Sequence, residues 1–153
     1  MTITIRQINV PRAARALSEL PQADYEDAFV VQLGNAQERT AEQWARAILE
    51  EAPANTRRKL TSGWSTIGLK LSRERSVLGW TVRQSTDDFV LLGADSRIGM
   101  PAELLFMRRA RSLLFSTFVQ RRNPVARLVW ARVEPVHGPI VLGLLEDAQR
   151  RLA

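Results

Sequence analysis

The C-terminal segment 123–153 is the longest stretch with helical character, and it limits the folds that the chain can adopt. Asn123 is suited to cap the first turn, and Pro124 fits the first helical position, where its missing N–H leaves no bond unmade. Apolar residues then recur at spacings of three and four, which places them on one helical face. They are Val125, Val129, Val133, Val136, Ile140 and Leu144. A face of this length predicts a sheet beneath the helix.

Two prolines interrupt this helical pattern. Pro135 and Pro139 remove two N–H donors and so release the carbonyl groups of Ala131 and Pro135 from helical bonding. We therefore expect a kink or a break at residues 133–139. His137, the only histidine, lies inside that stretch and borders the apolar face. Either the helix bends to follow a curved sheet, or the opened backbone lets a polar group enter a cavity.

Composition restricts the class of protein. The 153 residues suffice for one domain with a hydrophobic core, and we expect residues 1–153 to form that single domain. The absence of cysteine excludes disulfides, thiol catalysis and thiolate metal sites. The N-terminus lacks a signal-peptide pattern, and no apolar run approaches the roughly 18 residues that span a bilayer. We therefore expect a cytoplasmic protein without an integral membrane segment.

The positive charge is concentrated in the last third of the chain. Residues 97–153 hold ten arginines against four acidic residues, which accounts for the formal net charge of +6. Such an excess permits an anionic partner, such as nucleic acid, an acidic lipid surface or a carboxylate ligand. A solvated arginine rim explains it more simply, because several of these arginines fall at turns and helix ends. We expect no nucleic-acid binding.

The residues before the C-terminal segment alternate as strands do. Residues 24–33 carry apolar side chains on one face, and both Tyr25 and Asp27 belong to that face. Asp27 is either at the strand end in water or a buried, paired group with a purpose. Residues 2–10 form either an edge strand or an arm. Four further strands are expected at 77–84, 88–94, 101–108 and 112–121, and their short connections predict an antiparallel meander.

Two short helices separate the first strand from the meander. Thr40 and Gln43 form a capping box that opens a helix ending near residue 51. Asn55 is expected to cap the second helix, whose buried side includes Trp64. Both faces of the last strand are partly apolar, and the face that the long helix leaves free could meet a second copy of the chain, so a homodimer stays open.

The predicted order is strand, two helices, four-stranded meander, long helix. We expect an α+β fold, in which a curved antiparallel sheet carries the two short helices at one end and the long kinked C-terminal helix across its concave face. This arrangement encloses a space between helix and sheet. That space is a ligand pocket wherever side chains do not fill it.

Four segments carry a family resemblance: LPQADYEDAF at 20–29, TAEQWARAIL at 40–49, LGW at 78–80 and FSTFVQRRNPVARLVWARVEPVH at 115–137. With the element order, they resemble the helix-grip fold of the SRPBCC superfamily over about residues 17–150, and within it a group of uncharacterised bacterial proteins often found in actinobacteria. The superfamily includes START lipid-transfer domains, the birch pollen allergen family and polyketide aromatase/cyclase proteins. The resemblance implies a pocket for a lipid or a polyketide-like molecule. Fuller members have more than the five strands evident here, so we expect a shallower sheet.

Motifs for most kinds of catalysis are missing. The chain has no glycine-rich phosphate loop, no Walker pattern and no GxSxG motif, and one histidine without cysteine leaves no credible metal site. We therefore expect no metal and no cofactor. The leading hypothesis is a protein that binds a small apolar or amphipathic molecule between sheet and long helix, rather than an enzyme. The candidate ligand-binding residues are Trp130, His137, Arg127, Tyr25, Asp27, Trp64, Trp80 and Thr117.

Two alternatives stay open. In the first, a polyketide cyclase, an aromatase or a hydrolase uses His137 as general base or acid and Arg127 to polarise a carbonyl. The plainer roles of these residues are to satisfy a released carbonyl and to form an ion pair. In the second alternative, the core is filled and the protein is a structural, dimeric interaction protein. A continuous cavity favours binding or catalysis, and a His137 paired with a carboxylate and facing that cavity favours an enzyme.

Overall fold

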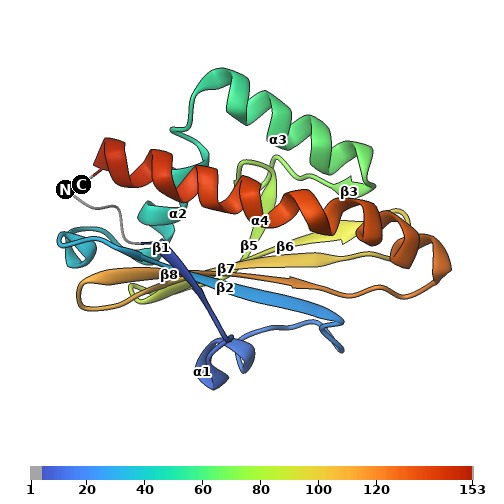
Figure 1. The fold of residues 1–153 in the computed structure, drawn as a ribbon, viewed down its shortest axis with the longest axis horizontal. Coiled ribbons are helices and arrows are strands. Elements are labelled where there is room, and N and C mark those ends of the chain that lie inside the picture. The colour runs from blue at the N-terminus through green and yellow to red at the C-terminus, as the bar shows by residue number, and fades with distance from the viewer. Residues whose placement is uncertain (1–4, 153) are drawn as a thin grey trace.

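An eight-stranded antiparallel sheet forms the base of the molecule (Figure 1). The computed structural model describes residues 5–152. The strand order is β1-β2-β8-β7-β6-β5-β4, and β3 pairs with β6. The strands are β1 (Ile5–Ile8), β2 (Tyr25–Gln32), β3 (Leu69–Lys70), β4 (Ser76–Val77), β5 (Trp80–Ser85), β6 (Phe89–Ser96), β7 (Ala102–Arg108) and β8 (Ser112–Val119). With a long C-terminal helix packed on this sheet, the predicted α+β fold is confirmed.

The sheet is wider than the five strands that the sequence predicts. The meander β5–β8 lies within a few residues of its predicted bounds, and β1 shows that residues 5–8 form an edge strand. The rest of that prediction, residues 2–4, lies outside the described residues. The strands β3 and β4 were missed because each has two residues, too few for an alternating pattern.

The helices occupy both sides of the sheet. They are α1 (Arg12–Arg15), a 3-10 turn (Ala36–Glu38), α2 (Ala41–Leu49), α3 (Ala54–Thr66) and α4 (Pro124–Leu152). Figure 1 shows α2, α3 and α4 on one side and α1 on the other. The capping box of Thr40 and Gln43 opens α2 as predicted. The cap predicted for α3 is wrong: the helix begins after Pro53, and Asn55 lies inside it, accepting a hydrogen bond from the next backbone N–H.

The long helix α4 is a single element that contains both Pro135 and Pro139. Asn123 caps it as predicted, since the N–H of Ala126 donates to Asn123 Oδ1 over 2.8 Å. Both prolines lie on the exposed side of the helix. The carbonyl groups that they release can therefore bond to water, which explains why the helix is not broken between residues 133 and 139.

The buried face of α4 overlaps the predicted stripe only in part: Leu144 is buried, and Val129 and Val133 are partly buried against the core. Val125, Val136 and Ile140 are 58%, 52% and 47% exposed. The buried residues are Ala126, Trp130, Val141, Leu144, Leu145 and Ala148. The helix is thus turned so that its larger side chains, Trp130 above all, are covered, because these remove the most apolar surface from water. This rotation moves His137 from the border of the buried face to its interior.

The outer side of α4 is apolar as well. Leu128 and Leu142 are exposed there. Among the described residues, α4 is the one helix whose length and composition would allow it to cross a membrane. This is weak evidence about a membrane, because the core helix of a soluble protein passes the same test.

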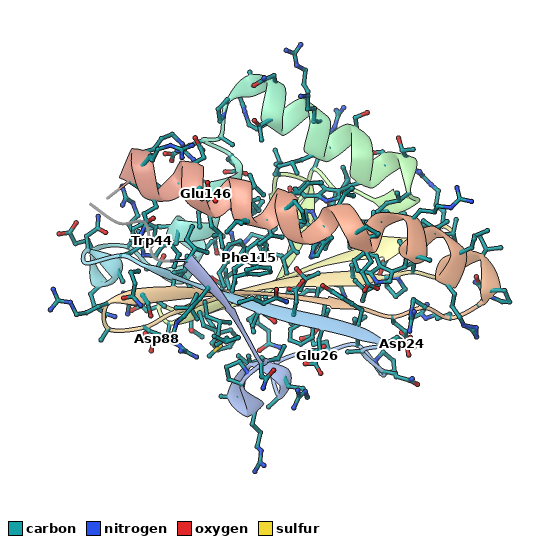
Figure 2. All side chains as sticks on the ribbon, in the orientation of Figure 1. Asp24, Glu26, Trp44, Asp88, Phe115 and Glu146 are labelled. Carbon is teal, nitrogen blue, oxygen red and sulfur yellow. The ribbon has the colours of Figure 1, made fainter. Side chains whose placement is uncertain are left out.

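Both faces of the sheet are covered within the chain. On the helix side, Trp44 and Phe115 belong to the main core and lie between the sheet and the helices (Figure 2). On the opposite side, Val10, Ala14 and neighbouring side chains pack on strand residues that include Phe118. The face on which a homodimer was predicted is therefore not open, although a homodimer by another surface stays a prediction.

Candidate functional site

A cavity of about 250 Å3 lies between α3, α4 and the sheet. Its floor is formed by side chains of β7 and β8, its roof by α4, and its side wall by α3 and the start of β5. The lining includes Ala102, Leu104 and Thr117 of the floor, Trp130, Val133 and His137 of the roof, and Gly63, Trp64 and Trp80 of the side wall. The wall is mainly apolar.

Small residues leave this space unfilled. The β7–β8 register pairs Ala102 with Val119 and Leu104 with Thr117, so two small side chains lie on the face beneath α4. Gly63 adds no side chain from α3, and a Cβ placed there would meet nothing within 4 Å. Leu60 is the one buried residue of α3. The helix α3 therefore covers the cavity without filling it.

Aromatic rings give the cavity a rigid wall. The rings of Trp64 and Trp80 meet edge to face, with their centroids 5.4 Å apart. The ring of Trp130 lies 4.7 Å from Tyr25 and 5.5 Å from His137. Such aromatic pairs hold each other in place and present flat, apolar surface to the cavity.

Asp27 is a buried acid directly beside this cavity. It is 4% exposed, and the β2–β8 register places it opposite Thr117. Its Oδ2 atom accepts a 2.6 Å hydrogen bond from the Tyr25 hydroxyl, and its Oδ1 atom accepts one of 3.3 Å from the backbone N–H of Thr117. Of the two sequence interpretations of Asp27, the buried and paired one is therefore correct, and the exposed one is wrong because β8 and α4 cover this end of β2.

His137 approaches the same carboxylate from α4. Its Nε2 atom is 3.1 Å from Asp27 Oδ2, although the N–H direction is not aligned with that oxygen well enough for a hydrogen bond. The His137 side chain is 16% exposed, and it lines the cavity. No hydrogen bond joins His137 to a carbonyl group in the described part of the chain. The sequence hypothesis that it satisfies a carbonyl released by proline is therefore not supported.

Tyr25, which contacts both Asp27 and His137, has a raised pKa. Burial raises the pKa of Tyr25 above its ordinary value, and the hydrogen bond to Asp27 raises that pKa further. The Tyr25 hydroxyl therefore remains a hydrogen-bond donor at neutral pH. Its ring also packs edge to face against His137, with the centroids 5.9 Å apart. Tyr25 thus fixes both partners of the Asp27–His137 pair.

Besides His137 Nε2, three polar side-chain atoms of cavity-lining residues are buried and lack a hydrogen-bond partner among residues 5–152. They are Thr117 Oγ1, Trp80 Nε1 and Trp130 Nε1. The three residues are 3%, 2% and 3% exposed, so water at the surface does not reach them. Leaving such a group unpaired costs about 1–3 kcal/mol. A ligand oxygen that moves the neighbouring side chains enough to reach one of these atoms would remove part of this cost.

The structure brings together seven of the eight predicted site residues. Five of them, Trp64, Trp80, Thr117, Trp130 and His137, line the cavity. Tyr25 and Asp27 lie behind His137 and contact it. Arg127 is not among them: it is exposed and lines a separate polar hollow that also includes Asp24. Figure 2 labels Asp24 at the end of β2 opposite to Trp44.

Sequence reasoning missed the residues that create the space. Gly63 was not considered, and Ala102 was expected only as the start of a strand. A glycine inside a helical pattern was the one available signal, since it weakens a helix unless packing or function needs it. Whether an alanine lines a cavity depends on what packs above it, which no local pattern shows.

A surface groove of about 460 Å3 between α3 and α4 adjoins the cavity. The groove and the cavity share Lys59, Leu60 and Ile140. The two hollows therefore lie next to each other along α3 and α4. The rim on α3 is basic, because Arg57, Arg58 and Lys59 follow one another and α3 has no acidic residue.

The described residues contain no group of three or more acidic or histidine side chains that could hold a metal ion. No protein-family model, no curated protein and no solved structure matches this chain.

Proposed function

We propose that this protein binds a small apolar or amphipathic molecule with at least one acceptor oxygen in the cavity beneath α4. The observation that carries this proposal is the set of unpaired polar atoms of Thr117, Trp80 and Trp130 in an otherwise apolar wall. A wall meant only to be packed would gain nothing from three unsatisfied donors.

The size of the cavity limits the ligand. An apolar cavity of about 150 Å3 is known to hold benzene in a protein core, so about 250 Å3 suits a molecule of roughly one or two rings, or a short acyl chain. The flat faces of Trp64, Trp80 and Trp130 favour a ring system. We place the oxygen of such a ligand near Thr117, because the buried hydroxyl of Thr117 is unpaired and its strand position faces that of Asp27.

Two matched compounds test this proposal. Beta-tetralone is a bicyclic ketone, and tetralin is the same hydrocarbon without the oxygen. We expect calorimetric titration to show that both bind and that the ketone binds about fivefold to tenfold more tightly, the value of one added hydrogen bond. The substitution Thr117→Val keeps the shape of the side chain and removes its hydroxyl, so it should narrow this difference. Failure of both compounds to bind would contradict the proposal and favour a structural role.

The other functional predictions from the sequence remain predictions. The resemblance to the SRPBCC superfamily, a lipid or polyketide-like ligand and a cytoplasmic location are compatible with a cavity between sheet and helix. The only histidine lines the cavity beside a buried carboxylate, which is a specific reason to consider catalysis.

A further inference from the structure

A binding cavity for an apolar molecule does not need a buried carboxylate beside it. Asp27 is 4% exposed, and burial of a charge is costly unless partners hold it. The chain supplies three such partners from three separate places, namely Tyr25, the backbone of Thr117 and His137. An apolar side chain in place of Asp27 would pack beside the cavity without needing any of these partners. The arrangement is typical of a group with a chemical task.

The contact with Asp27 gives the imidazole of His137 a defined orientation. Because Nε2 lies 3.1 Å from Asp27 Oδ2, the carboxylate favours the proton on Nε2. The other ring nitrogen, Nδ1, makes no hydrogen bond within residues 5–152 and keeps its lone pair. In an unliganded site, hydrogen bonds of catalytic groups are commonly misaligned and tighten when substrate binds, which fits the poor alignment of the Nε2–H bond.

Thr117 supplies the complementary group. It lies opposite Asp27 in the β2–β8 register, so its side chain and the Asp27–His137 pair occupy the same end of the cavity. Its hydroxyl is buried and unpaired in the described structure. Enolisation of a ketone requires a base and a hydrogen-bond donor within reach of one substrate, because the base removes a proton from carbon while the donor stabilises the oxygen on which negative charge develops.

We infer that the site catalyses proton transfer at the carbon next to a carbonyl group, in a small apolar ketone; this inference rests on the proposed binding function. The C–H bond beside the carbonyl breaks and its proton moves to Nδ1 of His137. The electron pair of that bond forms a carbon–carbon double bond, and the carbonyl π pair moves onto oxygen, where the Thr117 hydroxyl donates to it. His137 then returns a proton to the same carbon, or to the far end of a conjugated system, which shifts a double bond. No electrons are gained or lost overall, and no co-reactant is consumed.

The four residues have distinct roles in this step. His137 is the catalytic base, and Thr117 is the donor to the developing oxyanion. Asp27 and Tyr25 are positioning residues, since they act on the substrate through the imidazole. Arg127, which the sequence analysis paired with His137, lies in a different hollow and takes no part.

Exchange of hydrogen for deuterium tests the inference. Beta-tetralone dissolved in heavy water exchanges its protons next to the carbonyl, and proton NMR follows their loss. We expect the wild-type protein to accelerate this exchange in a saturable way. The substitution His137→Gln keeps a polar N–H near Asp27 but cannot act as a base, so it should keep ketone binding and lose the acceleration, a fall of about 100-fold or more. Binding is measured by calorimetry on the same samples.

Two further variants test the inference even if the His137→Gln protein does not fold. Thr117→Val should lower kcat for exchange with a smaller change in KM, since its hydroxyl acts mainly on the charged intermediate. Asp27→Asn should lower kcat by misorienting the imidazole, which a purely structural Asp27 would not do in a variant that remains folded and binds the ketone. If the ketone binds and exchanges no faster than in buffer, or as fast with His137→Gln as with wild type, the inference is wrong and the binding function stands. If the ketone does not bind, both fail.

Discussion

The Tyr25 hydroxyl donates a 2.6 Å hydrogen bond to Oδ2 of Asp27. The bond joins two polar side chains that lie on the otherwise apolar face of β2. Burial, and then this bond, raise the pKa of Tyr25 above the ordinary value of 10.0. The folded state therefore keeps a proton that the unfolded chain loses above pH 10. The stabilisation is complete below that pH and is lost as the pH rises further, because unfolding then releases a proton.

This relationship predicts the alkaline behaviour of the protein. Tyr25 is the only tyrosine, so tyrosinate absorbance reports on it alone. We expect this absorbance to appear together with unfolding rather than at pH 10, and the free energy of unfolding to fall by up to about 1.4 kcal/mol per pH unit above pH 10. Tyr25→Phe should cost about 1–2 kcal/mol at pH 7 and flatten that decline. Tyrosinate formation near pH 10 in the folded protein would contradict the buried bond.

The stability of the folded protein at low pH depends on Glu42 of α2. Its carboxylate accepts hydrogen bonds from Arg75, Ser85 and Arg46. These bonds, that of Arg75 most of all, lower the pKa of Glu42 from its ordinary value of 4.5 to about 2. The stabilisation is therefore present above pH 4.5 and is lost as the pH falls toward 2. After allowance for solvent screening at the exposed Arg75, we expect Glu42→Gln to cost about 1 kcal/mol at pH 7.

Denaturant unfolding between pH 2 and pH 7 measures this effect. The difference between wild type and Glu42→Gln should close as the pH approaches 2. Glu51→Gln is a matched control, because Glu51 is exposed near the end of the same helix and makes no side-chain hydrogen bond in the described structure. A difference that stays constant with pH would show that Glu42 acts by packing rather than by charge.

Glu103 on β7 should show the opposite dependence. Burial raises the pKa of Glu103, although the Ser18 hydroxyl and the backbone N–H of Glu19 both donate to its carboxylate. The folded state thus favours the protonated acid, so this contribution is present below the ordinary pKa of 4.5 and is lost as the pH rises through the raised one. Glu103→Gln should therefore become more stable relative to wild type between pH 4 and pH 8, again in denaturant unfolding. A constant difference over that range would argue against burial as the cause.

Gly63 offers a way to close the cavity without touching its polar end. A side chain there meets open space, and the residue lies inside α3. Gly63→Leu should therefore raise the free energy of unfolding by about 1 kcal/mol through helix propensity. It should also weaken binding of beta-tetralone at least about tenfold, because the new side chain occupies the space that the ligand needs.

Ser62→Leu is the control for that substitution. It places the same side chain one residue earlier in α3, at an exposed position that does not line the cavity. Its binding constant should match that of wild type. Equal binding by Gly63→Leu and Ser62→Leu would place the ligand elsewhere.

Local patterns predicted the features that are decided locally. The capping residues Thr40 and Asn123 needed only their neighbours in sequence, and both caps are present. The buried face of α4 was predicted only in part, because the rotation of a helix over a sheet is decided by how large side chains such as Trp130 fit beneath it. Counting apolar positions gave equal weight to valines that remain exposed.

The sequence allowed most residues of the site to be predicted, but not the contacts between them. Tyr25, Asp27 and His137 were identified as candidates from residue type and position. Their meeting depends on the β2–β8 register and on the rotation of α4, which are tertiary features. The cavity itself depends on Gly63 and on what α3 leaves unfilled, and no periodicity in the sequence encodes an empty space.

The most direct test of the account observes His137 while the cavity is being filled. As the only histidine, it gives imidazole proton NMR signals that need no assignment by mutation. On titration with beta-tetralone, these signals should shift in a saturable way in wild type and Ser62→Leu, and should stay unchanged in Gly63→Leu. Imidazole signals that remain fixed in the wild-type protein while the ketone is taken up would show that it binds outside the cavity and would contradict the account.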